Sequence, residues 1–200
     1  MLNVVFDFGN VLNHWRPEDV LLPFFDDPAD LHPTLDRIGF WDWNLEQDRG
    51  RDWDEAVAVA KAHHPKDAHL FRAYREGLAE AHAETIEQSL DIVHHLHAEG
   101  VPLYAITNAS IETVPLLERL HGYPSLFRDV VISAEVGLIK PDPEIFRVFL
   151  SRNGLAAETC LFIDDVAANV DGARSVGMKG IRFKSPDDLI ASLRSHGLPL

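Results

Sequence analysis

Five short apolar segments, each followed by a polar residue, constrain the fold of this chain more than any other feature of its sequence. The segments are rich in Val, Ile, Leu and Phe, and they do not alternate with polar residues. Continuous apolar runs of this length are typical of strands buried on both faces, as in a parallel sheet covered by helices. The predicted strands are residues 2–6, 101–106, 130–132, 161–163 and 180–183.

The segments between these strands have the pattern of helices. Residues 85–99 have apolar side chains at helical spacing and end before Gly100, a residue type common just beyond a helix. Asp142 is a predicted N-cap, with Pro143 at the first helical position. Alternating strands and helices predict an α/β fold, with a Rossmann-like parallel sheet and helices on both of its faces. Further helices are expected at residues 143–152, 166–176 and 187–195.

The connection between the first two predicted strands is far longer than the roughly one dozen residues that a crossover requires. Long loops without secondary structure are uncommon, so we expect this stretch to fold as a small domain of its own. Residues 54–63 and 70–83 are rich in Ala, Glu and Leu, which favours helices. We therefore predict a helical cap of residues 14–83, inserted after the first strand of a Rossmann-like core that is formed by residues 1–13 and 84–200.

The aromatic and polar residues of the predicted cap leave two questions open. Tryptophan bulk favours a packed core within the cap, although aromatic side chains with satisfied polar ends also line substrate pockets. The polar segment 43–51 is either a solvent-exposed turn or a surface that faces a ligand-binding site between the cap and the core. The four tryptophans of the chain, all in this region, are Trp15, Trp41, Trp43 and Trp53.

The net charge of the chain excludes some classes of partner. Eighteen Lys and Arg residues against 32 Asp and Glu residues give −14 at pH 7. A field of this sign repels nucleic acid and anionic membranes, but it permits a small phosphate ligand where local donors or a metal reverse it. Cys160 is the only cysteine, which favours a reducing compartment, and no apolar run approaches the roughly 18 residues of a membrane span. We expect a cytoplasmic protein that binds neither nucleic acid nor a membrane, and the sequence does not indicate its oligomeric state.

Chemically active side chains follow the predicted strands at their carboxyl ends, where open α/β sheets bind ligands. Asp7 follows the first strand and Thr107 the second. The acid pair 164–165 follows the fourth strand, and Lys140 lies beyond the third. Three carboxylates that converge on one crevice raise each other's pKa values, and Mg²⁺ relieves that repulsion. With anion donors at the lysine, the hydroxyl and the backbone near Asn108, the set suits phosphoryl transfer through an aspartyl-phosphate intermediate.

Four short motifs at these places resemble the motifs of the haloacid dehalogenase superfamily. Residues 4–12 (VVFDFGNVL) resemble the first motif and residues 106–108 (ITN) the second. Residues 140–143 (KPDP) resemble the third, and residues 162–165 (FIDD) the fourth. The four motifs occur in the family's order, and the predicted insertion is similar to the helical C1 cap of the first subclass. The form DxGNV of the first motif resembles phosphatases of the glucose-1-phosphate type.

The resemblance implies a role for each matching residue. It makes Asp7 the nucleophile and places Thr107 and Lys140 at the phosphate, so these three residues are the candidate catalytic set. It also implies a bound Mg²⁺ and a small phosphate ester as substrate. The candidate phosphate-binding residues are Thr107, Asn108, Lys140 and Asn10, and the candidate metal ligands are Asp7, Gly9 through its carbonyl, Asp164 and Asp165.

The first motif departs from the family pattern at Gly9. Most phosphatases of the superfamily have a second Asp there, which donates a proton to the leaving group and later accepts one from the attacking water. A glycine keeps the backbone carbonyl for the metal but removes a proton shuttle of a kind that contributes about 10²–10⁴-fold in rate. His14 is the nearest alternative donor in the sequence, and a good leaving group or slow catalysis would also fit.

The sequence thus predicts an Mg²⁺-dependent phosphatase that hydrolyses a small phosphorylated metabolite. Two alternatives stay open. A 2-haloacid dehalogenase would use Asp7 without a metal, but the acid pair 164–165 disfavours an ionised Asp7 in that case. A phospho-ligand-binding protein with little turnover would fit Gly9. Asn169 is a further candidate, as a residue that orients Asp164.

Overall fold

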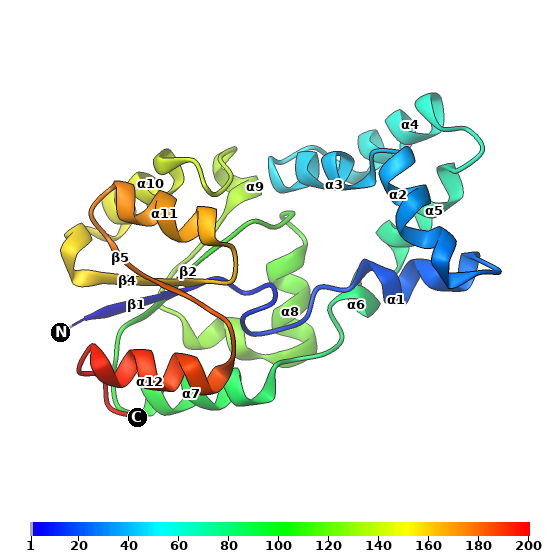
Figure 1. The fold of residues 1–200 in the computed structure, drawn as a ribbon. Helices are drawn as coiled ribbons and strands as arrows, with labels where there is room; N and C mark the ends of the chain where they lie inside the picture. The colour runs from blue at the N-terminus through cyan, green and yellow to red at the C-terminus, as the bar shows by residue number, and fades with distance from the viewer. Residues whose placement is uncertain (1) are drawn as a thin grey trace.

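A parallel sheet lies at the centre of the computed structural model, which describes residues 2–200 (Figure 1). Its strands are β1 (Asn3–Phe6), β2 (Leu103–Thr107), β3 (Val130–Ile132), β4 (Cys160–Asp164) and β5 (Lys179–Arg182). Over the described residues the sheet has five strands in the order β3-β2-β1-β4-β5, and all neighbours are parallel. The predicted α/β fold is therefore confirmed, with strand ends that lie within two residues of the prediction.

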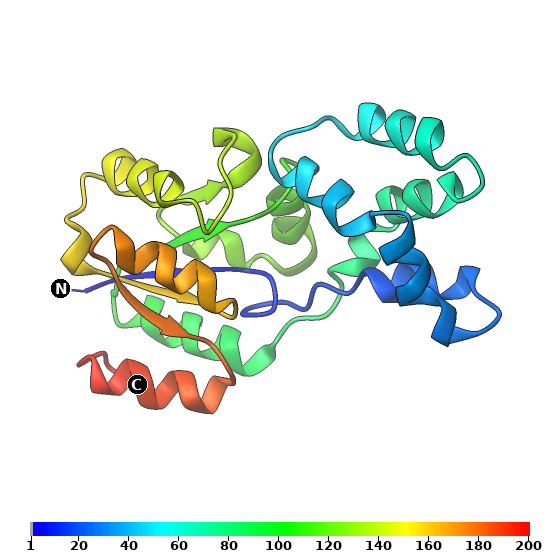
Figure 2. The same ribbon diagram turned by 45° about the horizontal axis from the view of Figure 1, so that its top comes forward.

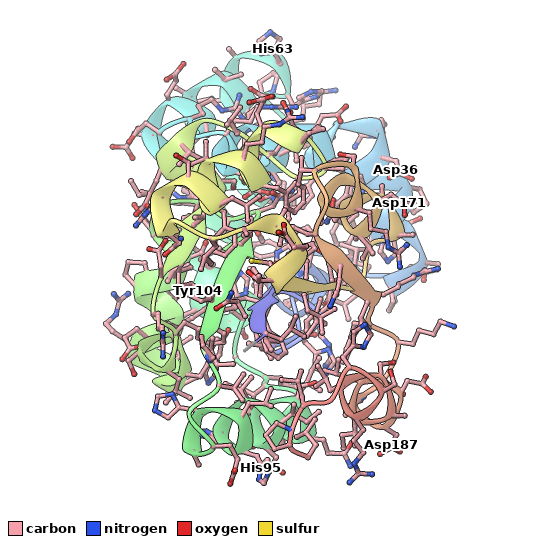
Figure 3. All side chains as sticks on the ribbon, turned by 90° about the vertical axis from the view of Figure 1, so that its left-hand side faces the viewer. Asp36, His63, His95, Tyr104, Asp171 and Asp187 are labelled. Atoms are coloured by element: carbon pink, nitrogen blue, oxygen red, sulfur yellow. The ribbon has the colours of Figure 1, made fainter. Side chains whose placement is uncertain are left out.

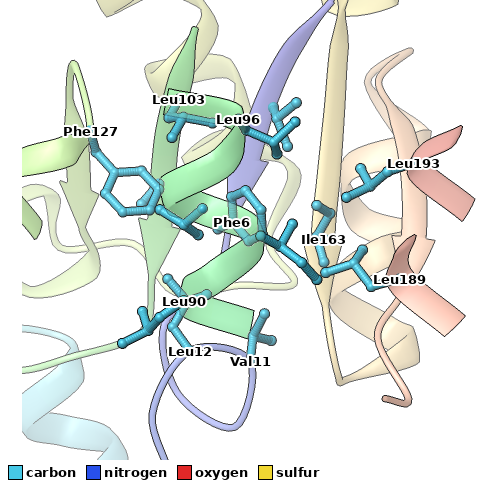
Figure 4. Packing of buried hydrophobic residues seen from close by; sticks show 14 of the residues in the cluster. Phe6, Val11, Leu12, Leu90, Leu96, Leu103, Phe127, Ile163, Leu189 and Leu193 are labelled. Atoms are coloured by element: carbon cyan, nitrogen blue, oxygen red, sulfur yellow. The ribbon is translucent and has the colours of Figure 1, made fainter. Parts of the chain in front are cut away.

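Helices cover both faces of the sheet, because alternate residues of each strand point to opposite faces. They are α7 (Glu87–Ala98), α8 (Thr113–His121), α10 (Pro143–Asn153), α11 (Ala167–Ser175) and α12 (Pro186–Ser195). Phe6 packs toward α7 and α12, in a cluster that includes Leu96 and Leu189 (Figure 4). Val5 belongs to a separate cluster with Phe146 of α10. The view in Figure 3 shows the two helical layers on either side of the strands.

The predicted helix α10 begins and ends at residues whose local structure explains its limits. The side chain of Asp142 accepts a hydrogen bond from the backbone N–H of Glu144 (2.9 Å), so Asp142 is the N-cap of α10 as predicted. Gly154 follows the same helix with φ 63°, a conformation that glycine adopts without strain. The sequence pattern does not predict α8, because Pro115 interrupts it, yet a proline in the first turn removes no helical hydrogen bond. No helix within residues 2–200 has the length and apolar character needed to cross a membrane.

A group of helices between β1 and α7 lies beyond the carboxyl ends of the strands (Figures 1 and 2). They are α1 (Pro17–Leu21), α2 (Leu31–Arg37), α3 (Phe40–Asp48), α4 (Trp53–His63), α5 (Ala68–Glu76) and α6 (Leu78–Ala81). We call residues 17–81 the helical insertion. Its apolar side chains, including Phe40 and Phe71, form a hydrophobic cluster that Leu116 of α8 also joins. The division into a cap of residues 14–83 and a core remains a prediction.

Local contacts explain where the insertion follows the expected helices and where it does not. Helix α4 matches the helix expected at 54–63, whereas the one expected at 70–83 is divided into α5 and α6 at Gly77. A Cβ atom at Gly77 would lie 2.5 Å from Cγ1 of Val20, so the absence of a side chain lets α1 approach this closely. Trp43 and Trp53 are buried in the cluster of the insertion, as expected for a packed core.

Gly172 determines how closely α11 approaches the loop after Lys140. A Cβ atom there would lie 2.5 Å from the backbone oxygen of Pro141 and 3.0 Å from Cε2 of Phe146. In Gly172→Ala, the higher helix propensity of alanine would stabilise the fold by about 1 kcal/mol. Overpacking against these atoms would destabilise it by about 1–3 kcal/mol. Because backbone atoms cannot move cheaply, we expect a net loss of stability, measured as a lower urea midpoint. Asp171→Ala, on the exposed side of the helix, is the control, and an equal or higher midpoint for Gly172→Ala would contradict the close packing.

Candidate active site

A buried lysine holds two carboxylates together at the carboxyl edge of the sheet. Nζ of Lys140 lies 2.8 Å from Oδ2 of Asp7 and 2.7 Å from Oδ2 of Asp164. Asp7 follows β1 and Asp164 ends β4. The pairing of Phe6 with Ile163 places the two acids side by side. The structure therefore brings three of the predicted site residues into direct contact.

Burial and charge oppose each other in this group. Burial raises the pKa of Asp7 to about 7, the charge of Lys140 acts to lower it, and the charges of Asp164 and Asp165 act to raise it. For Lys140, burial favours the neutral amine, but the two neighbouring carboxylates outweigh it and raise the lysine pKa above its ordinary value. Lys140 is therefore a buried ammonium ion, and its removal would leave buried acids without a counter-charge.

The adjacent acids Asp164 and Asp165 have different surroundings. Asp164 is fully buried, and its Oδ1 accepts a hydrogen bond from the backbone N–H of Val166 (2.8 Å). The side-chain amide of Asn169 donates to both oxygens of Asp164 (3.0 Å each), so Asn169 orients this carboxylate. Asp165 is half-buried, and burial raises its pKa. Of the two acids, Asp164 positions Lys140 and Asp165 is the more open to a ligand.

The acid group has the composition of a site for a hard cation. Asp7, Asp164 and Asp165 each offer one oxygen, and the three oxygens lie within 4.8 Å of one another. Gly9 lies beside them at the same cavity and presents a backbone carbonyl without a side chain. Carboxylate and carbonyl oxygens are ligands that Mg²⁺ accepts in proteins. The residues present therefore fit this ion.

The carboxyl end of β2 and the loop that follows it hold two of the predicted phosphate-binding residues. Thr107 is buried and lines the cavity. Oδ1 of Asn108 accepts a hydrogen bond from the backbone N–H of Lys140 (2.8 Å), and its Nδ2 donates to the Lys140 carbonyl (3.0 Å). The side chain of Asn108 therefore positions Lys140. Ser133, which the sequence analysis did not single out, accepts a hydrogen bond from the N–H of Ala109 (2.9 Å) and fixes the same loop.

Asn10 shapes the turn that follows Asp7. It has φ 55°, a left-handed conformation that asparagine tolerates better than most residues. Its side-chain oxygen accepts a hydrogen bond from the N–H of Trp15 (3.2 Å), and its own N–H donates to the carbonyl of Asn13 (2.6 Å). Because Asn10 also lines the cavity, it is placed to shape the loop around a ligand.

A cavity of ≈ 220 Å³ adjoins these groups. Pockets for drug-sized ligands have volumes of roughly 300–1,000 Å³, so this one suits a small ligand. Trp53 contributes an indole N–H that is buried without a hydrogen-bond partner among the described residues. The side chains that the insertion and its entry segment add to the lining are Trp15, Asn44, Asp48, Trp53, Tyr74 and Leu78.

Helix α3 presents two different faces, which resolves the two interpretations of residues 43–51. Asn44 and Asp48 are four positions apart and share one face, and both line the cavity. Trp43 and Gln47 are buried within the insertion. The sequence analysis singled out neither Asn44 nor Asp48, although a tryptophan beside polar residues at helical spacing is the signal of such a helix.

The histidine at the cavity is not the one that the sequence suggested. His14 is not among the described residues that line the cavity, whereas His82 is. Nδ1 of His82 accepts a hydrogen bond from the amide of Asn13 (3.0 Å), so the ring proton is on Nε2. Burial lowers the pKa of His82 to about 4, with a further contribution from His121. His82 is therefore a neutral hydrogen-bond donor near neutral pH and a poor source of protons.

Asp48 makes stability depend on pH. Burial raises its pKa from 3.8 to about 7, and the charges of Lys140 and Arg49 offset this only in part. An acid whose pKa is higher in the folded than in the unfolded chain destabilises the fold as pH rises through that interval. We therefore expect Asp48→Asn to raise the free energy of unfolding by about 1–2 kcal/mol at about pH 8, allowing for the exposed part of the carboxyl group, and by little at about pH 4.

Urea unfolding at the two pH values measures this difference. Asp42→Asn, which changes an exposed acid on the same helix, is the matched control. A gain of equal size at both pH values would show that the charge of Asp48 is not its cause.

Comparison with known proteins identifies relatives of the chain. Residues 46–183 match the sequence model of the haloacid dehalogenase-like hydrolases. The chain is 32% identical over 92 residues to the sesquiterpene phosphatase astK of Aspergillus oryzae, covering 46% of this chain and 47% of that protein. It is 29% identical over 182 residues to the pyrophosphatase PpaX of Bacillus velezensis, covering 88% of this chain and 73% of that protein. The chain spans less than half the length of several curated relatives that it matches.

The fold is also similar to those of solved structures. The HAD family enzyme BT-2542 of Bacteroides thetaiotaomicron, in complex with magnesium and inorganic phosphate, has a TM-score of 0.73 at 20% identity, over 92% of this chain and 95% of that chain. At this identity the similarity concerns the fold alone. Because the family's sequence model matches most of the chain, and the four motifs meet at one edge of a sheet of the same fold, this protein belongs to the haloacid dehalogenase-like hydrolase family.

Proposed function

We propose that this hydrolase is an Mg²⁺-dependent phosphatase that hydrolyses a small phosphorylated metabolite through an aspartyl-phosphate on Asp7. The observation that carries the proposal is the pairing of Lys140 with Asp7, which is one of three carboxylates whose oxygens lie within 4.8 Å of one another. A nucleophilic carboxylate, a fixed ammonium and the hydroxyl of Thr107 suit an anionic phosphoryl group. The phosphatases among the relatives, and the similar fold that holds magnesium and inorganic phosphate, support the same reading.

The metal would be held by residues that face the cavity. Asp7, Asp165 and the carbonyl of Gly9 would provide ligands, with Asp164 beside them. When bound, Mg²⁺ supplies positive charge that offsets the carboxylates and the phosphoryl oxygens. Lys140 supplies a second, permanent positive charge beside Oδ2 of Asp7 and Oδ2 of Asp164.

The chain's own residues direct two successive transfers. An oxygen of Asp7 bonds to phosphorus while the bond from phosphorus to the ester oxygen breaks, and the electron pair leaves with that oxygen. A water molecule then bonds to the same phosphorus, which releases inorganic phosphate and restores the Asp7 carboxylate. Lys140 and Thr107 bind the phosphoryl oxygens in both steps, and the side chains of the insertion limit the access of bulk water.

The insertion gives this proposed site its selectivity. Trp15, Trp53 and Tyr74 line the cavity, so a leaving group with an apolar face fits there better than a highly charged one. We propose that residues 14–83 act as a cap that closes over the bound substrate. The net charge of −14 disfavours nucleic acid as a substrate or partner.

Two other functions compete with the proposed phosphatase, and different residues argue for or against each. Asp164 and Asp165 disfavour a metal-independent 2-haloacid dehalogenase, because without a metal ion only Lys140 offsets their charges, which oppose ionisation of Asp7. Gly9 is the observation that favours a phospho-ligand-binding protein with little turnover. Such a protein would bind phosphate or a metal at the same residues without releasing product.

Asp7→Asn tests the proposed nucleophile. The wild-type protein is expected to hydrolyse 4-nitrophenyl phosphate in MgCl2 but not in EDTA. Asp7→Asn is expected to lower kcat by at least about 10³-fold, because an amide cannot replace the attacking carboxylate. Release of 4-nitrophenolate measures both rates, and Asp42→Asn on the exposed surface is the control.

Other outcomes identify the alternatives. Chloride release from chloroacetate without a metal, abolished by Asp7→Asn, would establish the dehalogenase. Hydrolysis that survives in Asp7→Asn would assign the nucleophile to another residue. Phosphate binding without turnover across a panel of phosphate esters would favour the binding protein.

A further inference from the structure

One proton in the proposed reaction lacks an obvious donor. When the bond from phosphorus to the ester oxygen breaks, that oxygen becomes basic and needs a proton to leave readily. Gly9 has no side chain to provide one. Because the first motif lacks the group, a protein donor for this proton would be another side chain at the cavity.

The cavity offers few groups that could act as this donor. Asp7 is the nucleophile, and Lys140 and Asp165 are engaged with the phosphoryl group and the cation. Burial raises the pKa of the Tyr74 phenol and lowers that of His82 to about 4, so neither is an effective acid near neutral pH. The titratable residues among the described lining are Asp7, Asp48, Tyr74, His82, Lys140 and Asp165. Asp48 is the remaining candidate.

A contact between the insertion and the core places Asp48 at the cavity. Asp48 is the last residue of α3, and Gly50 lies against the short core helix α9 (Ser133–Val136). A Cβ atom at Gly50 would lie 2.8 Å from the backbone oxygen of Ala134, and Gly50 has φ 102°, so a glycine is required on both counts. Figure 1 shows the end of α3 facing α9. Since Ser133 of α9 also fixes the loop after β2, α3 is docked on the structure that positions the phosphate-binding residues.

The carboxyl group of Asp48 is not committed to another role within residues 2–200. It forms no hydrogen bond or ion pair there, and the charges of Lys140 and Arg49 lower its pKa only in part. It is half-buried and lies at the carboxyl end of a helix, where the helix dipole disfavours a negative charge. Such surroundings favour a carboxyl group that keeps its proton near neutral pH.

On the basis of the proposed phosphatase function, we propose that Asp48 is the general acid and base that takes the place of the side chain absent at Gly9. In the first transfer, the O–H bond of protonated Asp48 breaks and the proton moves to the ester oxygen, so the leaving group departs as a neutral alcohol. In the second, the Asp48 carboxylate takes a proton from the attacking water while the water oxygen bonds to phosphorus and the bond to Asp7 breaks. The cycle releases inorganic phosphate and returns Asp48 to its protonated form.

The acidity of Asp48 suits this role. Burial raises its pKa to about 7, and a general acid is most effective when its pKa lies near the working pH. Core and insertion both contribute charged or titratable groups around it. They are Asp7, Lys140 and Asp165 of the core, Arg49 of its own chain segment, Tyr74 of α5 and His82.

Aryl phosphates with different leaving groups test the proposal. Proton donation matters most for a basic leaving group, so Asp48→Asn is expected to lower kcat/KM by about 10²-fold or more for phenyl phosphate but less than about threefold for 2,4-dinitrophenyl phosphate. The fall of kcat/KM above about pH 7 for phenyl phosphate should also disappear, because it reports loss of the proton from Asp48. An equal loss for all leaving groups would assign Asp48 to substrate binding and overturn the proposal.

Two variants on the same helix are matched controls. Asn44→Ala changes a cavity-lining residue one turn away that has no acidic proton, so its effect should be the same for every leaving group. Asp42→Asn changes an exposed acid and should leave all rates at the wild-type value. A leaving-group dependence in Asn44→Ala as steep as in Asp48→Asn would count against a specific role for the acid.

Gly9 provides a rescue experiment. A Cβ atom at Gly9 would meet no atom within 4 Å, so a side chain can start there without a clash. Added to Asp48→Asn, the substitution Gly9→Asp is expected to restore kcat/KM for phenyl phosphate by at least about tenfold, whereas Gly9→Ala is not. Recovery in both double variants, or in neither, would overturn the proposal.

The same measurements separate this proposal from the phosphatase function on which it rests. If the wild-type protein in MgCl2 hydrolyses none of the aryl phosphates, both proposals fail. If hydrolysis requires Asp7 but Asp48→Asn has the leaving-group dependence of the wild type, only the role of Asp48 fails.

Discussion

The buried contact of Lys140 with Asp7 and Asp164 is the interaction on which the rest of the site depends. Losing one partner of a buried ion pair is strongly destabilising, so the surrounding structure must hold all three groups in place. The register between β1 and β4 brings the two acids together. The side chain of Asn108 holds the backbone of Lys140, and Gly172 lets α11 pack closely against the same loop. Sheet pairing, loop hydrogen bonds and helix packing thus together fix the position of the Lys140 ammonium group between its two carboxylates.

The burial that makes these acids reactive also costs stability. Burial raises the pKa of both Asp7 and Asp48 to about 7, so the fold is less stable when they are ionised than it would be with neutral residues. Lys140, whose Nζ lies 2.8 Å from Asp7, favours the ionised form of that acid, whereas Asp48 has no ion-pair partner within residues 2–200 and keeps its proton more readily. The two apolar clusters on the faces of the sheet stabilise the fold and so offset the free energy that is lost by burying these acids.

The sheet and its edge could be predicted from sequence because Asp7, Thr107 and Asp164 lie directly at the ends of apolar runs. Asp7 follows one parallel strand and Thr107 ends another, and the carboxyl ends of parallel strands meet at one edge whatever the strand order. The insertion could not be resolved in this way. Asp48 and Trp43 lie on the same helix, and which of them meets the site depends on how that helix docks. The docking contact of Gly50 is with Ala134, which is far away in the sequence, so no local sequence pattern predicts it.

Transferring the proton donor from the first motif to the insertion changes what controls the reaction. An aspartate at position 9 would share a loop with Asp7 and would be in place however the insertion is docked. Asp48 is in place only while α3 rests on α9 through Gly50. Under the proposed mechanism, the nucleophile of the core and the acid of the insertion meet only when the two parts are together, which is also when bulk water is excluded. The fit of the substrate then affects the rate of the chemical step itself, because a ligand that prevents α3 from docking also keeps Asp48 away from the leaving group.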